Sequence, residues 1–72
     1  MEKEQLTQRE LEILKGIVEG QTDRGIAKSL FISEYTVRSH IKNLYRKLGV
    51  TSKAQAVTKA LQEKIINTDG QK

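Results

Sequence analysis

The chain has 72 residues, 36% of them hydrophobic and 31% charged, and it contains no Pro and no Cys. This length is enough for one small domain, and the absence of Cys excludes disulfides and thiolate-bound metals as sources of its stability. No apolar run reaches the roughly 20 residues that span a membrane, and no signal-peptide pattern opens the chain. We therefore expect one mostly helical, cytoplasmic domain that is held together by helix packing or dimerisation and does not engage a membrane.

Basic residues are concentrated in the second half of the chain. The net charge is +4, yet residues 1–34 contain five basic and seven acidic residues. Residues 35–62 contain six basic residues and no acidic one. A positive field centred on one segment is typical of proteins that bind nucleic acids. Charge alone leaves an equal alternative open, which is a solvated basic face without a partner.

The first predicted helix begins at a capping box, Thr7-Gln8-Arg9-Glu10. The Thr hydroxyl can accept a hydrogen bond from the Glu10 amide while the Glu10 carboxylate reaches back. An apolar stripe at helical spacing follows, formed by Leu11, Leu14, Ile17 and Val18, with Ile13 on its flank. Gly20 ends the pattern, which predicts a helix over residues 7–19.

The second predicted helix starts after Thr22, a natural N-cap, and covers residues 23–31. Its apolar side consists of Ile26, Ala27, Leu30 and Phe31. Gly25 costs about 1 kcal/mol relative to Ala in a helix interior. Either this helix is short and held by packing, or a neighbouring element needs the space at Gly25.

The third predicted helix covers residues 33–48, between an N-cap at Ser33 and a C-cap at Gly49. Its narrow apolar stripe is formed by Val37, Ile41, Leu44 and Leu48. The opposite side carries Tyr35, Arg38, Ser39, Lys42 and Arg46. A short helix, a tight turn and a longer helix with a polar outer face indicate a helix-turn-helix, although the usual turn glycine is absent.

The fourth predicted helix covers residues 52–66 and begins at a second capping box, from Ser52 to Gln55. It carries more apolar surface than one stripe needs. One side consists of Ala54, Val57, Leu61 and Ile65, and another of Ala56 and Ala60. This surplus suggests contact with the core and with a second protein, and the predicted dimerisation residues are Ala54, Val57, Thr58 and Leu61.

Several spaced motifs meet in this chain: Leu6-Thr7-x-Arg9-Glu10-x-Glu12-Ile13-Leu14, Gly20, Ile26-Ala27-x-x-Leu30, Ile32-Ser33-x-x-Thr36-Val37-x-x-His40, Lys47-Leu48-Gly49-Val50 and Ala56-Val57. Together they resemble the DNA-binding domain of the bacterial LuxR/NarL (GerE-like) transcription regulators. The resemblance covers residues 6–66, between segments 1–5 and 67–72, which we expect to be flexible. It implies an all-α, four-helix domain with a central helix-turn-helix, in which the third helix enters the major groove and the fourth forms a two-fold dimer.

Two basic side chains on the outer face of the third helix, Arg38 and Lys42, lie one helical turn apart. Arg can donate two hydrogen bonds to O6 and N7 of guanine, and Lys can reach the same acceptors or a phosphate. The resemblance implies that Ser39 joins them where relatives meet base edges. It also implies contacts with the DNA backbone or groove wall by Thr22, Thr36, His40, Arg46 and Lys47. To these candidates for backbone contact we add Ser33, Tyr35 and Lys53.

Some of these residues have an alternative role. Tyr35 could pack on a neighbour instead, Thr36 could serve only in local capping, and His40, which has no nearby metal ligands, could be structural. Two positions depart from the family pattern. Gly25 stands where relatives usually carry Glu, and Lys53 stands where Arg is typical, so a point charge replaces a bidentate group.

These observations predict a transcription regulator that binds double-stranded DNA sequence-specifically, as a homodimer on two half-sites about one helical turn apart. We expect it to act on the nucleoid, with RNA polymerase as a further candidate partner. The sequence has no Ser-His-acid arrangement and no glycine-rich phosphate loop, so we expect no enzyme activity, cofactor, metal or small-molecule ligand. The alternative is a protein-interaction module whose basic helix and fourth helix dock an acidic protein.

Overall fold

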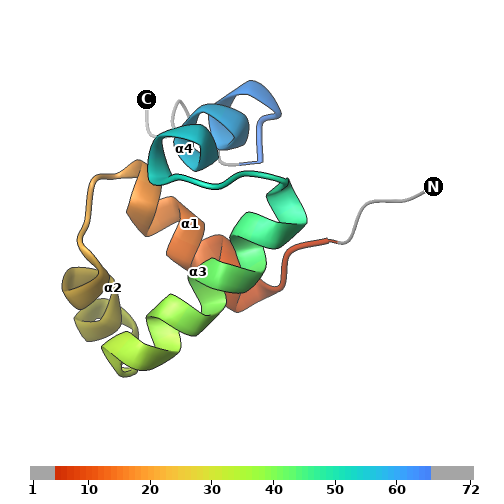
Figure 1. The fold of residues 1–72 in the computed structure, drawn as a ribbon. Coiled ribbons are helices and arrows are strands. Elements are labelled where there is room, and N and C mark those ends of the chain that lie inside the picture. Colours follow the sequence, from red (N-terminus) through yellow and green to blue (C-terminus); the bar gives the residue numbers. More distant parts are fainter. Residues whose placement is uncertain (1–4, 66–72) are drawn as a thin grey trace.

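Four helices and the turns between them make up residues 5–65, the part of the chain that this computed structural model describes (Figure 1). They are α1 (Gln8–Val18), α2 (Asp23–Leu30), α3 (Glu34–Leu48) and α4 (Lys53–Gln62), and the described residues form no strand. The prediction of an all-α, four-helix domain is therefore confirmed. Apart from Gln5, the two segments that we expected to be flexible lie outside the described residues. Within residues 5–65, no helix combines the length and the apolar character that a membrane crossing requires.

Each helix begins at the hydroxyl side chain that the sequence predicts. Thr7 Oγ1 accepts from the Glu10 N–H at 3.1 Å, and the Thr7 N–H donates to Glu10 Oε1 at 2.9 Å, which completes the capping box. The same kind of hydroxyl cap is made by Thr22, Ser33 and Ser52. The second predicted capping box is only half present, because Gln55 Oε1 accepts from the Thr51 N–H at 2.9 Å rather than from the Ser52 N–H.

All four helices end in the same kind of turn, which passes through one residue in the left-handed region: Gly20, Phe31, Gly49 and Lys64. In α4, the Lys64 N–H donates to the Leu61 carbonyl at 3.3 Å and the Ile65 N–H to the Ala60 carbonyl at 2.9 Å. These two bonds define a Schellman motif. The predicted extension of this helix to residue 66 is therefore wrong. The helical spacing of apolar residues continues to Ile65 because the turn folds that side chain back onto the core.

The core lies around α1 and α3, each of which packs against the other three helices. The buried apolar residues of the core are Ile13, Leu14, Ile17, Ile26, Ala27, Val37, Leu44, Leu48, Ala56 and Ala60. Ile13 is fully buried, so its predicted place on the flank of the stripe is wrong, and Leu11 is only partly buried. The single-stripe prediction fails because α1 has neighbours on more than one side.

The turn between α2 and α3 is closed without a glycine. Phe31 takes the left-handed position at φ 61° and ψ 42°, and the Ile32 N–H donates to the Ala27 carbonyl at 3.0 Å. The Phe31 side chain is 93% exposed. Its predicted place on the apolar side of the second helix is therefore wrong, because the chain leaves the helix at this residue. The turn nevertheless sets α3 directly after α2, as a helix-turn-helix requires.

The close approach of two helices occurs at Gly16 of α1, which the sequence did not single out. A Cβ on Gly16 would lie 2.8 Å from Ile26 Cγ1, too near for any side chain. Gly25 lies in the first turn of α2, where its N–H donates to Thr22 Oγ1 at 3.0 Å. A Cβ on Gly25 would meet Thr22 Oγ1 at 3.4 Å and no other helix. Of the two alternatives for Gly25, the structure supports a short helix held by packing.

Candidate nucleic-acid interface

The outer face of α3 is exposed over the length of the helix. Val37, Leu44 and Leu48 are buried against the other helices, chiefly α1 and α2. On the opposite side, Tyr35, Arg38, Ser39, Lys42 and Arg46 are exposed. Figure 1 shows α3 running along one side of the molecule, with α2 beside its first turns. The structure therefore brings the three predicted base-contacting residues together on one accessible face.

Arg38 is already oriented in the free chain. Its Nε donates to Asp23 Oδ2 at 3.4 Å, and its Nη2 donates to Glu34 Oε1 at 3.1 Å. These carboxylates belong to the first residues of α2 and α3, so the guanidinium lies between the starts of both helices. Ser39 and Lys42 are exposed on the same face.

Three predicted backbone-contacting hydroxyls lie at helix starts. Thr22 and Ser33 accept hydrogen bonds from amides in the first turns of α2 and α3. The Ser33 hydroxyl also donates to Thr36 Oγ1 at 2.9 Å, so the local capping role of Thr36 is present. The Thr36 hydroxyl proton is not used in that bond and remains available to an anion. The free amides of these first turns also favour negative charge.

The other predicted backbone contacts occupy different environments. Tyr35 is 79% exposed, which argues against packing on a neighbour within this chain. Arg46 and Lys53 are exposed, whereas His40 is half-buried. All of them except Lys53, at the start of α4, belong to α3. The positive side chains therefore extend beyond the base-contacting face towards the end of α3 and the start of α4.

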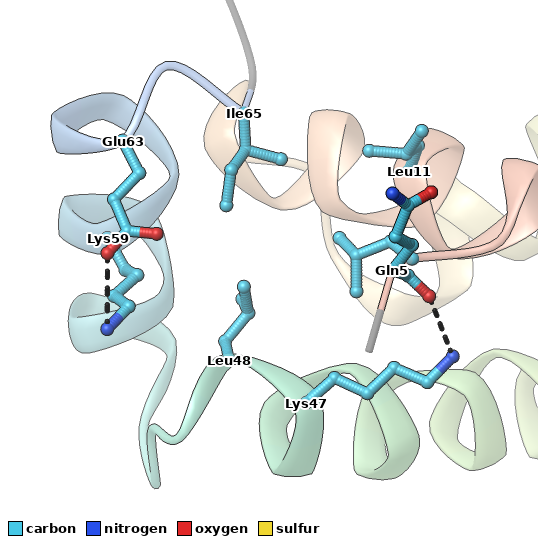
Figure 2. A pocket seen from close by; sticks show the side chains of 8 residues that line it. Gln5, Leu11, Lys47, Leu48, Lys59, Glu63 and Ile65 are labelled. Atoms are coloured by element: carbon cyan, nitrogen blue, oxygen red, sulfur yellow. Dashed lines mark hydrogen bonds and ion pairs between the residues drawn. The ribbon is translucent and has the colours of Figure 1, made fainter. Parts of the chain in front are cut away.

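Lys47 lies apart from the exposed basic residues, on the side of α3 that faces α1. Its Nζ is 2.9 Å from Glu10 Oε1, and the side chain is 14% exposed. The same Nζ is 3.3 Å from the Gln5 carbonyl oxygen (Figure 2). Sequence reasoning missed the pairing of Lys47 with Glu10. The available signal was the position of Lys47 directly beside the apolar stripe that contains Leu44 and Leu48.

The environment of Glu10 keeps its carboxyl group ionised. Burial by itself raises the pKa of Glu10, but hydrogen bonds from Lys47 and from the Thr7 backbone, together with the Lys47 charge, bring the net pKa below its ordinary value. One oxygen, Oε1, accepts from both Thr7 and Lys47. The same carboxylate therefore caps α1 and ties it to the last turn of α3.

The surface of α4 has the two sides that the sequence predicts. Ala56 and Ala60 are fully buried in the core. Of the four predicted dimerisation residues, Val57 is half-buried, and Ala54, Thr58 and Leu61 are exposed. Ile65, predicted on the same side, follows the end of the helix and packs on the core. The exposed apolar surface of α4 is therefore smaller than predicted.

An apolar groove of about 390 Å³ lies between the start of the described chain, the end of α3 and α4 (Figure 2). Its apolar lining is Leu6, Leu11, Leu48 and Ile65. Polar side chains at its edge include Lys59 and Glu63, which form an ion pair at 3.3 Å. Within residues 5–65 there is no group of three or more His, Cys, Asp or Glu side chains that could hold a metal ion.

Comparison with known proteins places this domain. The family of bacterial regulatory proteins called the luxR family matches residues 4–60, which is most of the chain. The chain belongs to the luxR family. The prediction of a LuxR/NarL-type, GerE-like helix-turn-helix domain is thereby confirmed.

Individual relatives of this luxR-family chain differ in length. The spore germination protein GerE of Bacillus subtilis (strain 168) is 49% identical over 57 residues, which are 79% of this chain and 77% of GerE. The transcriptional regulatory protein YdfI of the same organism is 43% identical over 65 residues, which are 90% of this chain and 30% of YdfI. The chain thus spans less than a third of the length of YdfI.

Two solved structures have the same fold. The structure of the transcription factor GerE superposes with a TM-score of 0.73 and 44% identity, over 79% of this chain and 85% of that one. The response regulator ChrA of a heme-sensing two-component system gives a TM-score of 0.85 and 41% identity, over 92% of this chain and 33% of ChrA.

Proposed function

We propose that this luxR-family chain binds duplex DNA sequence-specifically, with α3 in the major groove, and regulates transcription. The observation that carries the proposal is the outer face of α3, where Arg38, Ser39 and Lys42 are exposed together. The major groove of B-DNA, about 12 Å wide, admits one α-helix. The buried stripe of α3 anchors it on α1 and α2, so that this outer face can enter the groove as a rigid unit.

Base reading is assigned to the three residues of that face. Arg38 suits guanine, whose O6 and N7 accept two parallel hydrogen bonds from a guanidinium. Lys42, one turn further along, can reach the same acceptors on a neighbouring base or a phosphate. Ser39 lies between them, and its small side chain lets the backbone of α3 approach the bases closely.

Contacts with the sugar-phosphate backbone position the helix without reading sequence. The starts of α2 and α3 supply Thr22, Ser33 and Thr36, and other exposed positions supply Tyr35, Arg46 and Lys53, with His40 at the edge of α3. Lys47 was predicted among these contacts, but its ammonium group is bonded to Glu10. We therefore assign Lys47 an indirect role, which is to hold α3 on α1.

We further propose that the chain acts as a homodimer through the exposed side of α4. A two-fold dimer would present two copies of α3 to half-sites about one helical turn apart, roughly 34–36 Å. Ala54, Thr58 and Leu61 are accessible for this contact. A dimer formed through them leaves the outer face of α3 exposed, so that α3 can still bind DNA. In this role the chain works in the cytoplasm on the nucleoid, where RNA polymerase is the partner to test.

Selection of bound duplexes from a random pool tests DNA reading. We expect a defined sequence preference and a steep salt dependence, with a log–log slope of about −0.9 for each phosphate contacted. Arg38→Ala should weaken binding to the selected duplex by about 1–3 kcal/mol and relax the preference at one base pair. Arg9→Ala, which removes a charge from α1 and its pair with Glu12, is the matched control. Equal, weak binding to any polyanion would instead favour the protein-interaction module.

A further inference from the structure

The guanidinium that is assigned to base reading has two acidic neighbours within this chain. Asp23 opens α2 and Glu34 opens α3, and both carboxylates bond to Arg38. The three side chains are 62%, 35% and 39% exposed for Arg38, Asp23 and Glu34, so the cluster lies at the surface. The bond from Arg38 places the Asp23 carboxylate against α3, where its charge adds to the effect of burial in raising the pKa of Tyr45.

The two hydrogen bonds use specific donors of Arg38 and leave others available. Asp23 accepts from Nε and Glu34 accepts from Nη2, while neither bond uses Nη1. A guanidinium has five N–H donors in one plane. The two hydrogens of Nη1 and the second hydrogen of Nη2 are therefore available to O6 and N7 of guanine. The carboxylates thus orient the guanidinium while these donors remain unused.

Orientation of Arg38 before binding has a thermodynamic effect. A free Arg side chain carries about 2 kcal/mol of rotamer entropy, part of which is lost when it contacts a base. A side chain that is already held in the reading geometry loses less on binding. Surface ion pairs of this kind contribute little to folding stability. The location of these two pairs in the interface therefore indicates a role in binding rather than in folding.

The two negative charges also act on sequences that Arg38 does not read. A carboxylate near the interface repels phosphates whatever the base sequence, and this repulsion lowers non-specific affinity. At the correct base pair, the gain from the oriented guanidinium offsets that repulsion. Both effects increase the ratio of the affinity for the specific DNA sequence to the affinity for non-specific DNA.

We infer that Asp23 and Glu34 are positioning residues that determine specificity by aiming Arg38 at one base pair and by disfavouring all other DNA. This inference rests on the proposed function, because it concerns the same face of α3. It adds two acidic residues to an interface for which only basic and hydroxyl side chains were predicted.

Single substitutions that keep the shape of the side chain test this role. For Glu34→Gln and for Asp23→Asn, we expect non-specific affinity to rise and discrimination at the base pair read by Arg38 to fall by about three- to fivefold, the size of a surface ion-pair contribution. Glu12→Gln is the matched control, since Glu12 is 38% exposed and pairs with Arg9 on α1 at 3.1 Å. It changes the charge equally but should leave base discrimination unaltered.

A double-mutant cycle separates positioning from a general charge effect. In the Arg38→Ala background, Glu34→Gln should no longer change base preference, because there is no guanidinium to aim. If Glu34→Gln kept the parental base preference, or altered it equally with and without Arg38, the inference would be overturned. A parent chain that selects no duplex would overturn the proposed function itself, and the positioning role with it. Thermal melting of each variant verifies that the fold is retained.

Discussion

Phe31 occupies a position at which its side chain gains nothing from the rest of the described chain. It is 93% exposed and adopts φ 61°, a left-handed conformation that costs a non-glycine residue roughly 1–2 kcal/mol. We therefore expect Phe31→Gly to raise the free energy of unfolding by about 1 kcal/mol. Urea denaturation measures this gain, and Phe31→Ala, which removes the ring but keeps the strain, is the control. A less stable Phe31→Gly variant would mean that the ring makes a stabilising contact.

Glu10 and Lys47 form an ion pair that is largely shielded from water, with side chains 5% and 14% exposed. Lys47→Met would leave the Glu10 carboxylate without its counterion, and removing one partner of a buried pair is strongly destabilising. We expect a loss of roughly 2–3 kcal/mol by chemical denaturation, somewhat less than for a completely buried pair. The double variant Glu10→Gln/Lys47→Met should recover part of the loss. A loss no larger than that of Glu12→Gln would contradict this account.

The carboxyl group of Glu10 makes the stability of the domain depend on pH. The pKa of Glu10 in the folded chain lies below its ordinary value of 4.5, so the unfolded chain binds a proton first as the pH falls. The contribution of Glu10 is therefore fully present above pH 4.5 and is lost as the pH falls through the folded pKa. Between about pH 5 and pH 3, the parent should lose more stability than Glu10→Gln. Parallel melting curves across this range would reveal equal losses if Glu10 were not responsible.

At the scale of the helices, two glycines of similar sequence context have opposite structural roles. A Cβ on Gly16 would lie 2.8 Å from the buried Ile26 and would force α1 and α2 apart. Overpacking of this kind typically costs about 1–3 kcal/mol, so Gly16→Ala should be destabilising. Gly25→Ala meets no such contact and should stabilise α2 by up to about 1 kcal/mol through its helix propensity. Circular dichroism during urea unfolding distinguishes the two, and equal effects would contradict the packing at Gly16.

The accuracy of prediction at this scale follows from the range of the interactions. Helix starts were predicted correctly because a hydroxyl cap and its amide are three residues apart. The end of α4 was not, because a turn through Lys64 returns Ile65 to the core, and apolar spacing alone cannot distinguish that turn from another helical turn. The role of Gly16 depends on Ile26 of another helix, and no local pattern shows that contact.

In the candidate site, as in the fold, the features set by local sequence could be predicted and the contacts between helices could not. Periodicity correctly placed Arg38, Ser39 and Lys42 on the exposed side of α3, because the apolar stripe determines which side is buried. The pairing of Lys47 with Glu10 and the approach of Asp23 to Arg38 join residues 37 and 15 positions apart. Such contacts depend on how the helices pack, which one sequence does not reveal.

At the scale of the whole molecule, the exposed side of α4 determines the assembly that we propose. Leu61→Glu places a charge on this surface and should shift a dimer towards monomers without unfolding the domain, since Leu61 is exposed. Light scattering with and without a duplex of two half-sites measures the change. Gln8→Glu, an equal charge change on the exposed start of α1, is the control. A parent chain that stays monomeric in both conditions would rule out the dimer.

The central position of α1 has a consequence for the way in which the domain unfolds. Since α1 packs against α2, α3 and α4, removing it would expose buried surface on each of them. Local unfolding that leaves α1 in place is limited to the ends and the surface of the domain, and unfolding of α1 unfolds the whole domain. Unfolding is therefore expected to be a single cooperative event. A small helical domain of this kind folds within microseconds to milliseconds, so a chain that unfolds regains the exposed face of α3 almost at once.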